Sequence, residues 1–204
     1  MSEVETPLGP ARVLATEPAG PAVGTLVLGG GAGGSVETAP DLVAVADAAP
    51  AGGWRVLRVE QPWRVAGGRI APAPARLDIA WTAVVERLRD DGVLTGALVL
   101  GGRSAGARVA CRTATALGAT GVLALAFPLH PPGRPEKSRA DELTGAGVPV
   151  LVVQGETDAF GRPEDVAAVL AGRRDASVYA VPGDHSLKKS PALVAAAAVH
   201  WLSS

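Results

Sequence analysis

Short apolar runs alternate along the chain with longer segments in which apolar and charged positions recur at helical spacing. Runs that are apolar throughout are typical of strands covered on both faces, as in a parallel sheet between helices. The predicted strands are Thr25 to Leu28, Trp54 to Val59, Ala97 to Leu100, Val122 to Phe127, Val150 to Val153 and Val178 to Val181. The pattern therefore predicts an α/β fold with a mostly parallel sheet of about six to eight strands.

Helices are predicted between these strands. In the clearest, Leu77, Trp81, Val84, Val85 and Leu88 share one face, and Arg76, Asp78, Glu86, Arg87 and Asp90 share the other. Further helices are expected near residues 39–48, 105–117, 138–145, 163–171 and 190–202. Residues 3–18 are expected to form an extended pair, antiparallel to the rest, with a turn at Gly9-Pro10. Glu60 to Pro74 is the longest irregular stretch, and so long a loop is usually functional.

Composition narrows the class of protein. The 204 residues are 48% hydrophobic with a net charge of −1, which predicts one compact domain over residues 1–204. Near-neutral charge and the lack of a basic run argue against a nucleic-acid partner. Met1 to Val13 carries Glu3 and Glu5 and no continuous apolar stretch, so neither a signal peptide nor a membrane anchor is expected. Small molecules are the expected partners.

Cysteine and histidine are scarce. Cys111 is the single cysteine, which excludes an intramolecular disulfide, and only three histidines could serve a metal. No metal or other cofactor is therefore predicted, and a reducing, cytoplasmic compartment fits best. Cys111 lies seven residues after Ser104 on the same predicted helix and is expected to be a core residue rather than a nucleophile.

The predicted strand Ala97 to Leu100 runs into Gly102-Arg103-Ser104-Ala105-Gly106, and a helix follows. A serine between two such glycines, with a strand before it and a helix after it, is the pattern of a nucleophile elbow. The glycines are needed because side chains would clash in so tight a turn. Ser104 is therefore the candidate nucleophile, at the positive end of the helix dipole.

An activated serine needs a base and an acid, which in this architecture follow in the order nucleophile, acid, base. His185 lies after the last predicted strand and fits the base. His130 precedes the acid candidates and is expected in the pocket, and His200 is expected on the surface of the final helix. Glu156 and Asp158 both follow the strand Val150 to Val153. Asp158 is preferred, because it lies farther past the strand between Gly155 and Gly161, although a helix-capping role remains open for either carboxylate.

Acyl transfer also needs donors for an oxyanion. The backbone amide of Ala105, next to the nucleophile, is one candidate. The second is expected from the loop Gly29-Gly30-Gly31-Ala32-Gly33-Gly34, where Ala32 is the chosen residue. The same loop matches the Gly-x-Gly-x-x-Gly pattern of dinucleotide sites, with Glu60 after the next strand, but that interpretation leaves Ser104, Asp158 and His185 unexplained.

Together these residues resemble the α/β-hydrolase superfamily, and more narrowly its small lid-less members of dienelactone-hydrolase type. The hydrolase domain shared by testis-expressed protein 30 and the third regulatory subunit of the NSL histone acetyltransferase complex is the most similar. The stretches that carry the resemblance are Leu28 to Gly34, Gln61-Pro62-Trp63-Arg64, Gly102 to Gly106, Phe127-Pro128-Leu129-His130-Pro131-Pro132-Gly133, Gln154 to Gly161 and Gly183-Asp184-His185-Ser186. The resemblance implies an α/β-hydrolase fold without a cap domain and a triad of Ser104, Asp158 and His185.

One departure from that pattern matters. The family usually has histidine where this chain has Gly30, so the resemblance implies a less restrained oxyanion loop.

Two functions follow from these observations. The first is a serine hydrolase that cleaves a small ester, thioester or related acyl bond through an acyl-enzyme. The second is a catalytically weak or inactive hydrolase-fold module for protein interaction. The expected substrate pocket is formed by Trp63, Arg64, Arg103, Phe127, His130 and Phe160. Arg64 and Arg103 are candidates for binding an anionic acid portion of the substrate.

Overall fold

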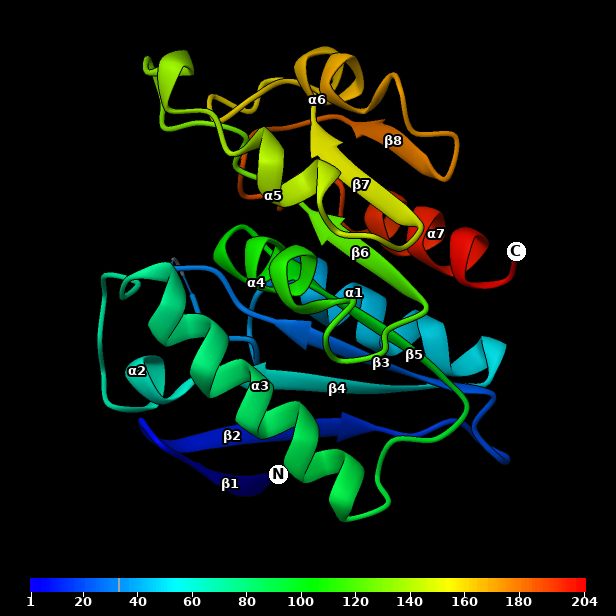
Figure 1. Ribbon diagram of the computed structural model, residues 1–204. Helices are drawn as coiled ribbons and strands as arrows, with labels where there is room; N and C mark the ends of the chain where they lie inside the picture. Colours follow the sequence, from blue (N-terminus) through cyan, green and yellow to red (C-terminus); the bar gives the residue numbers. More distant parts are fainter. Residues whose placement is uncertain (33) are drawn as a thin grey trace.

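The structure, a computed structural model, describes residues 1–32 and 34–204, and its described strands form one sheet of eight in the order β1-β2-β4-β3-β5-β6-β7-β8 (Figure 1). β2 pairs antiparallel with β1 and β4, and the strands from β4 to β8 are parallel. The strands are β1 (Ser2–Thr6), β2 (Gly9–Thr16), β3 (Gly24–Gly29), β4 (Trp54–Glu60), β5 (Ala97–Arg103), β6 (Gly121–Leu125), β7 (Val150–Gly155) and β8 (Ala176–Val181). The predicted, mostly parallel sheet is confirmed.

Helices cover both faces of the sheet. The helices α3 (Pro74–Asp90), α4 (Ala105–Thr113), α5 (Ala140–Thr144) and α6 (Pro163–Leu170) pack on one face, and α1 (Pro40–Ala48) and α7 (Pro191–Leu202) pack together on the other (Figure 1). Right-handed crossovers explain the places of α1 and of α3 to α6, because the chain moves one way across the sheet from β3 to β4 and the opposite way from β4 onward, and α7 follows the last strand. Two cores result, one on each side of the sheet.

The step from β4 to β5 passes over β3, which lies between these two strands. The loops that leave β3 and β5 therefore turn to opposite faces, and a crevice opens at the carboxyl ends of these strands. The register pairs Gly29 with Gly102, so the glycine loop after β3 begins beside the turn that carries Ser104. The topology itself brings the two predicted site segments together.

Several boundaries differ from the sequence prediction. The N-terminal turn precedes Gly9, where the Thr6 hydroxyl donates to the carbonyl of Gly9 at 2.7 Å. The helix ends at Thr113, earlier than expected, and turns follow to residue 118. The segment 60–74, expected to be irregular, contains the short helix α2 (Pro62–Val65), because Pro62 supplies a fixed φ at a helix start. A short 3₁₀ helix, η1 (Ala49–Gly52), follows α1.

The segment between β6 and β7 holds only η2 (Pro135–Lys137) and α5, so the described chain has no cap domain there. In residues 1–32 and 34–204 no helix is long and apolar enough to span a membrane.

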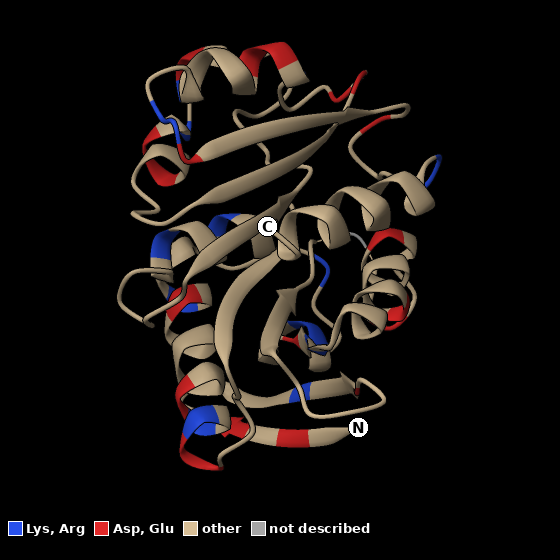
Figure 2. Ribbon diagram, turned by 90° about the vertical axis from the view of Figure 1, so that its right-hand side faces the viewer, with Lys and Arg blue, Asp and Glu red and all other residues tan. Residues whose placement is uncertain are grey.

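Basic and acidic segments are interspersed on the visible face rather than gathered by sign (Figure 2). The strongest cluster joins three helices. Arg108 and Arg112 of α4 bind Glu142 of α5 at 2.5 and 2.8 Å, and Arg112 also binds Asp78 of α3 at 2.6 Å. Burial raises the pKa of Glu142, but the hydrogen bonds and charges of the two arginines outweigh it and hold that pKa below 4.5. The cluster fixes α4, whose first turn follows Ser104.

We predict that Glu142→Gln lowers the free energy of unfolding at pH 7 by about 1–2 kcal/mol, because two half-buried guanidinium groups lose a charged partner. The folded pKa of Glu142 lies below its unfolded value, so the stabilisation is complete above pH 4.5 and is lost as the pH falls through the folded pKa. Urea unfolding at several pH values measures both effects. Glu136→Gln, at an exposed position, is the control, and equal effects of the two substitutions would contradict the account.

Candidate active site

Ser104 occupies the single residue between β5 and α4, with φ of 54° and ψ of −109°. A positive φ is costly for a residue with a side chain and is retained where the surroundings fix it. Its backbone amide donates to the Leu125 carbonyl of β6 at 2.9 Å, which anchors the turn to the neighbouring strand. The predicted strained turn is present, with the serine at its apex.

The two glycines around Ser104 allow the end of β3 to approach. A Cβ atom on Gly102 or on Gly106 would lie 2.3 Å from the carbonyl oxygen of Gly29. Gly102 also has φ of 150°, within the region that side chains disfavour. Any side chain at either position would separate the elbow from the loop after β3.

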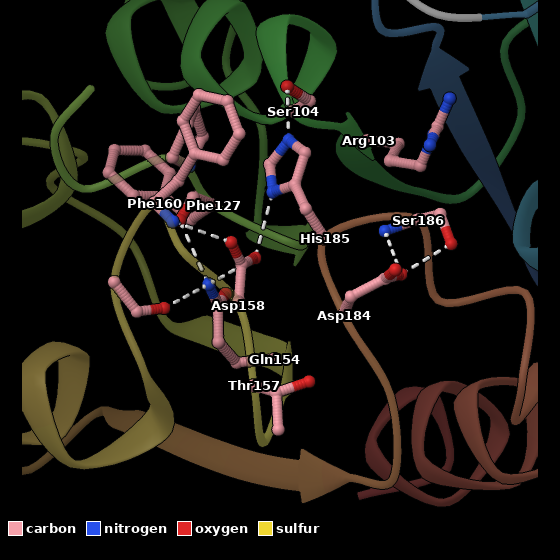
Figure 3. A network of polar contacts seen from close by, with 12 residues as sticks. Arg103, Ser104, Phe127, Gln154, Thr157, Asp158, Phe160, Asp184, His185 and Ser186 are labelled. Carbon is pink, nitrogen blue, oxygen red and sulfur yellow. Dashed lines mark hydrogen bonds and ion pairs between the residues drawn. The ribbon is translucent and has the colours of Figure 1, made fainter. Parts of the chain in front are cut away.

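Ser104, His185 and Asp158 form a continuous hydrogen-bonded chain (Figure 3). The Ser104 Oγ lies 2.9 Å from Nε2 of His185, and Nδ1 of His185 lies 2.8 Å from Oδ2 of Asp158. The Asp158 side chain is completely buried and that of His185 is 22% exposed. The carboxylate accepts the Nδ1 proton, so Nε2 is left as an acceptor for the serine hydroxyl.

Two further residues hold Asp158 and His185 in place. The amide Nε2 of buried Gln154 donates to Asp158 Oδ2 at 2.9 Å and also to the carbonyls of Phe127 and Gly161 (Figure 3). The backbone amide of Phe160 donates to Asp158 Oδ1 at 2.8 Å. The Phe160 ring lies 4.2 Å from the imidazole centroid, so it packs against His185. Sequence reasoning did not identify Gln154, because a polar residue at the end of a strand carries no motif.

The loops that carry Asp158 and His185 are tied to each other. Thr157 donates through both its amide and its hydroxyl to the carbonyl of Gly183, each at 2.9 Å. A Cβ on Gly155 would lie 2.7 Å from that same carbonyl oxygen, so only glycine allows the approach. On the other side of His185, the fully buried Leu187 anchors its loop in the core. Glu156, the alternative acid, is exposed and contributes its backbone amide to the Val181 carbonyl.

The glycine loop after β3 lies against the elbow. A Cβ on Gly31 would be 3.2 Å from Cβ of Ser104, and Ala32 lines the same cavity as Ser104. Ala105 begins α4, where the first amides have no intrahelical acceptor. Gly33 lies outside the described residues. A Cβ on Gly30 would lie 2.8 Å from Val36 Cγ1, so buried Val36 fills the space that a side chain at residue 30 would need.

Ser104 and His185 open into a cavity of about 480 Å³ lined also by Ala32, Arg103, Thr157, Ala159, Phe160, Asp184 and Ser186. Of the predicted pocket residues, the structure brings Arg103 and Phe160 to this cavity. Trp63 and Arg64 instead line a much smaller cavity behind the glycine loop, together with Ala105. Phe127 is fully buried in the core. The imidazole of His130 hydrogen-bonds the Pro131 carbonyl, so it is turned to its own loop.

Charged groups near the site form ion pairs or hydrogen bonds with their neighbours. The Nε of Arg103 lies 3.7 Å from Oδ2 of Asp41, and burial raises the pKa of Asp41 while Arg103 opposes that rise. Hydrogen bonds from the Ser186 hydroxyl and amide lower the pKa of Asp184. Cys111 is buried, which raises its pKa to about 12 and makes it unsuited to nucleophilic attack. Within the described residues, no three His, Cys, Asp or Glu side chains gather as metal ligands.

Comparisons with known proteins agree with the fold. The family profile described as "Alpha/beta hydrolase domain" matches residues 22–200. A search of the curated proteins gives no match.

Among solved structures, an alpha-beta serine hydrolase homologue from Coxiella burnetii is similar, with a TM-score of 0.81, 17% identity, and 98% of this chain and 96% of that chain covered. XC6422 from Xanthomonas campestris, described as a serine hydrolase without lid, has a TM-score of 0.74 and 22% identity over 100% and 94% of the chains. Est1E from Butyrivibrio proteoclasticus has a TM-score of 0.80 and 16% identity over 98% and 96%.

We predict that Gly106→Ala destabilises the protein by about 2 kcal/mol or more, because the new methyl group would overlap the Gly29 carbonyl. Chemical denaturation measures the loss. The matched control is Gly172→Ala, where an added Cβ meets no atom within 4 Å. If both variants unfold at the same denaturant concentration, the close contact at Gly29 does not constrain the fold.

Proposed function

The chain belongs to the alpha/beta hydrolase family, and on that premise we propose that it is a serine hydrolase that cleaves a small ester, thioester or related acyl bond through an acyl-enzyme. The observation that supports this most strongly is the hydrogen-bonded chain from Ser104 through His185 to buried Asp158. A serine nucleophile needs an imidazole that can accept its proton and a buried carboxylate that stabilises the resulting imidazolium. His185 and Asp158 are placed to supply these two groups to the strained Ser104.

In the first half of the proposed reaction, Ser104 Oγ attacks the acyl carbon while its proton moves to Nε2 of His185. Asp158 stabilises the imidazolium that forms, through the Nδ1 hydrogen bond. The carbonyl oxygen gains the negative charge, and the backbone amides of Ala105 and Ala32 are the proposed donors to it. The protonated imidazole then gives its proton to the leaving alcohol or thiol, the bond to the leaving group breaks, and the acyl group remains on Ser104.

In the second half, a water molecule loses a proton to His185 and attacks the same acyl carbon. Collapse of the second tetrahedral species breaks the bond to Ser104 Oγ, and the proton returns from His185 to the serine. The products are a carboxylic acid and the restored enzyme. The Phe160 ring beside the imidazole would keep His185 facing Ser104 through both halves.

The cavity indicates a small substrate that binds near the surface. It measures about 480 Å³, and Thr157, Ala159 and Asp184 on its wall are exposed. A structure of Est1E holds ferulic acid, so that protein accommodates a small carboxylic acid in a similar fold. By analogy, a compact acyl group is the proposed substrate portion here.

The proposal also includes the wider expectations from the sequence. Residues 1–204 act as one hydrolase domain in the cytoplasm, on a small-molecule acyl substrate, with no nucleic-acid or membrane partner. The narrower kinship is with dienelactone-hydrolase-type enzymes and the hydrolase domain of testis-expressed protein 30 and the NSL complex subunit.

We predict that a fluorophosphonate probe labels the native protein on Ser104, and that Ser104→Ala abolishes labelling and lowers ester turnover by roughly 10⁴-fold or more. Gel fluorescence and peptide mass spectrometry measure the label. Ser138→Ala, at an exposed serine in another loop, is the control and should label normally. Labelling that persists in Ser104→Ala would exclude Ser104 as nucleophile, and a native protein that neither labels nor turns over esters would favour an interaction module.

We predict that Asp158→Asn lowers kcat roughly 10³- to 10⁴-fold while Glu156→Gln changes it less than about threefold. The asparagine amide would donate to Nδ1, so the remaining proton would move to Nε2 and His185 could no longer accept from Ser104. Turnover of an activated ester by both variants decides the matter. The reverse ranking would identify Glu156 as the acid.

A further inference from the structure

Arg103, the residue before Ser104, is a cation enclosed beside the site and not used by the mechanism above. Its side chain is 11% exposed, and its Nε lies 3.7 Å from a carboxylate oxygen of Asp41, whose side chain is completely buried. Asp41 belongs to the first turn of α1, which follows the glycine loop. Keeping a charge pair out of water is costly unless its geometry is well fixed. This pair therefore marks a constraint that joins β5 to the start of α1.

The Arg103 side chain lies against the glycine loop that lies between these two elements. A Cβ on Gly31 would be 3.7 Å from Nε of Arg103, and a Cβ on Gly34 would be 3.8 Å from its Nη2. The guanidinium thus lies close to the backbone of Gly31 and of Gly34. Figure 3 shows the same side chain directed away from the Ser104 hydroxyl, beyond His185. Its position is that of a support for the loop.

We infer that Arg103 and Asp41 are positioning residues, which hold the loop of Gly30, Gly31, Ala32 and Gly34 at a fixed distance from Ser104. The catalytic consequence rests on the proposed function, in which Ala32 of this loop donates to the oxyanion. A run of glycines has wide conformational freedom, and an amide that must be ordered during the reaction stabilises the transition state less than one already in place. The buried pair removes that freedom before substrate binds.

This role differs from the direct binding of an anionic substrate, for which Arg103 was a candidate on sequence grounds. If Arg103 binds the substrate, it does so independently of Asp41, and its replacement affects one class of ester. If Arg103 positions the loop, it acts together with Asp41, and its replacement affects all esters equally. The difference is measurable with two esters of equal length, one with a neutral acyl group and one that ends in a carboxylate.

The experiment compares Arg103→Met, Asp41→Asn and the double variant. We expect kcat to fall about 10- to 100-fold for both esters in each variant, with little change in KM. Displacement of a catalytic group lowers the rate by about this factor. The double variant should be no worse than the poorer single variant, because both substitutions break one interaction. Arg103→Lys, which keeps the charge but not the planar fork, should retain more activity than Arg103→Met. If Arg103→Met does not fold, Arg103→Lys replaces it in the comparison.

Hydrogen–deuterium exchange supplies a readout that needs no turnover. Amides of residues 30–32 and 34–39 should exchange faster in Arg103→Met and in Asp41→Asn. Arg173→Met is the control, because Arg173 is also largely covered, at 16% exposed, and pairs at 2.7 Å with the half-exposed Asp175 beside β8, and it should leave exchange in residues 30–32 and 34–39 unchanged.

Unchanged exchange in both site variants would overturn the inference. The inference would also be overturned if Arg103→Met raised KM for the anionic ester alone and Asp41→Asn did not. That result would assign Arg103 to substrate binding. A native protein without turnover or probe labelling would instead refute the proposed function, and the exchange data would still decide the positioning role.

Discussion

The contact between two backbones at the Gly29 carbonyl is the constraint on which the site depends. Gly102 and Gly106 both approach this oxygen so closely that a Cβ on either would lie 2.3 Å from it. The contact follows from the parallel β3–β5 register, which pairs Gly29 with Gly102 at the point where the connections after the two strands turn to opposite faces of the sheet. It sets the nucleophile elbow beside the glycine loop, so that Ser104 and Ala32 line one cavity. A second close contact, between Gly155 and the Gly183 carbonyl, does the same for the loops of Asp158 and His185.

The sequence was sufficient for features that depend on local pattern. Continuous apolar strands predicted the parallel sheet, and the glycine spacing around Ser104 with its strand-turn-helix context predicted the elbow. The order along the chain put Asp158 and His185 after successive strands, and the structure brings His185 to Ser104 and Asp158 to His185. Contacts that depend on tertiary packing were not predictable. Trp63 and Arg64 were expected at the pocket, but the short helix α2 packs beside β2 and turns them to a separate cavity. Gln154 and Asp41 lie in no motif, and their roles emerge only from what they touch.

The polar groups of the site differ in how deeply they are buried. Asp158 is completely buried, so its carboxylate depends on Gln154 and Phe160 as well as on His185. His185 is partly exposed, which leaves its Nε2 side accessible from the cavity. The wall that faces solvent has few aromatic side chains and no cap above it in the described chain. This open wall is consistent with the proposed small acyl substrate.

The central claim is that an acyl group is carried on Ser104 during turnover. Rapid acid quench of the protein with an activated ester, followed by intact-mass and peptide mass spectrometry, tests it most directly. The account predicts a mass increase equal to the acyl group, located on the peptide that contains Ser104, appearing before steady-state product and decaying when the ester is exhausted. Two results would contradict the account. One is product formation with the adduct on another residue, and the other is product formation without any adduct that persists in Ser104→Ala.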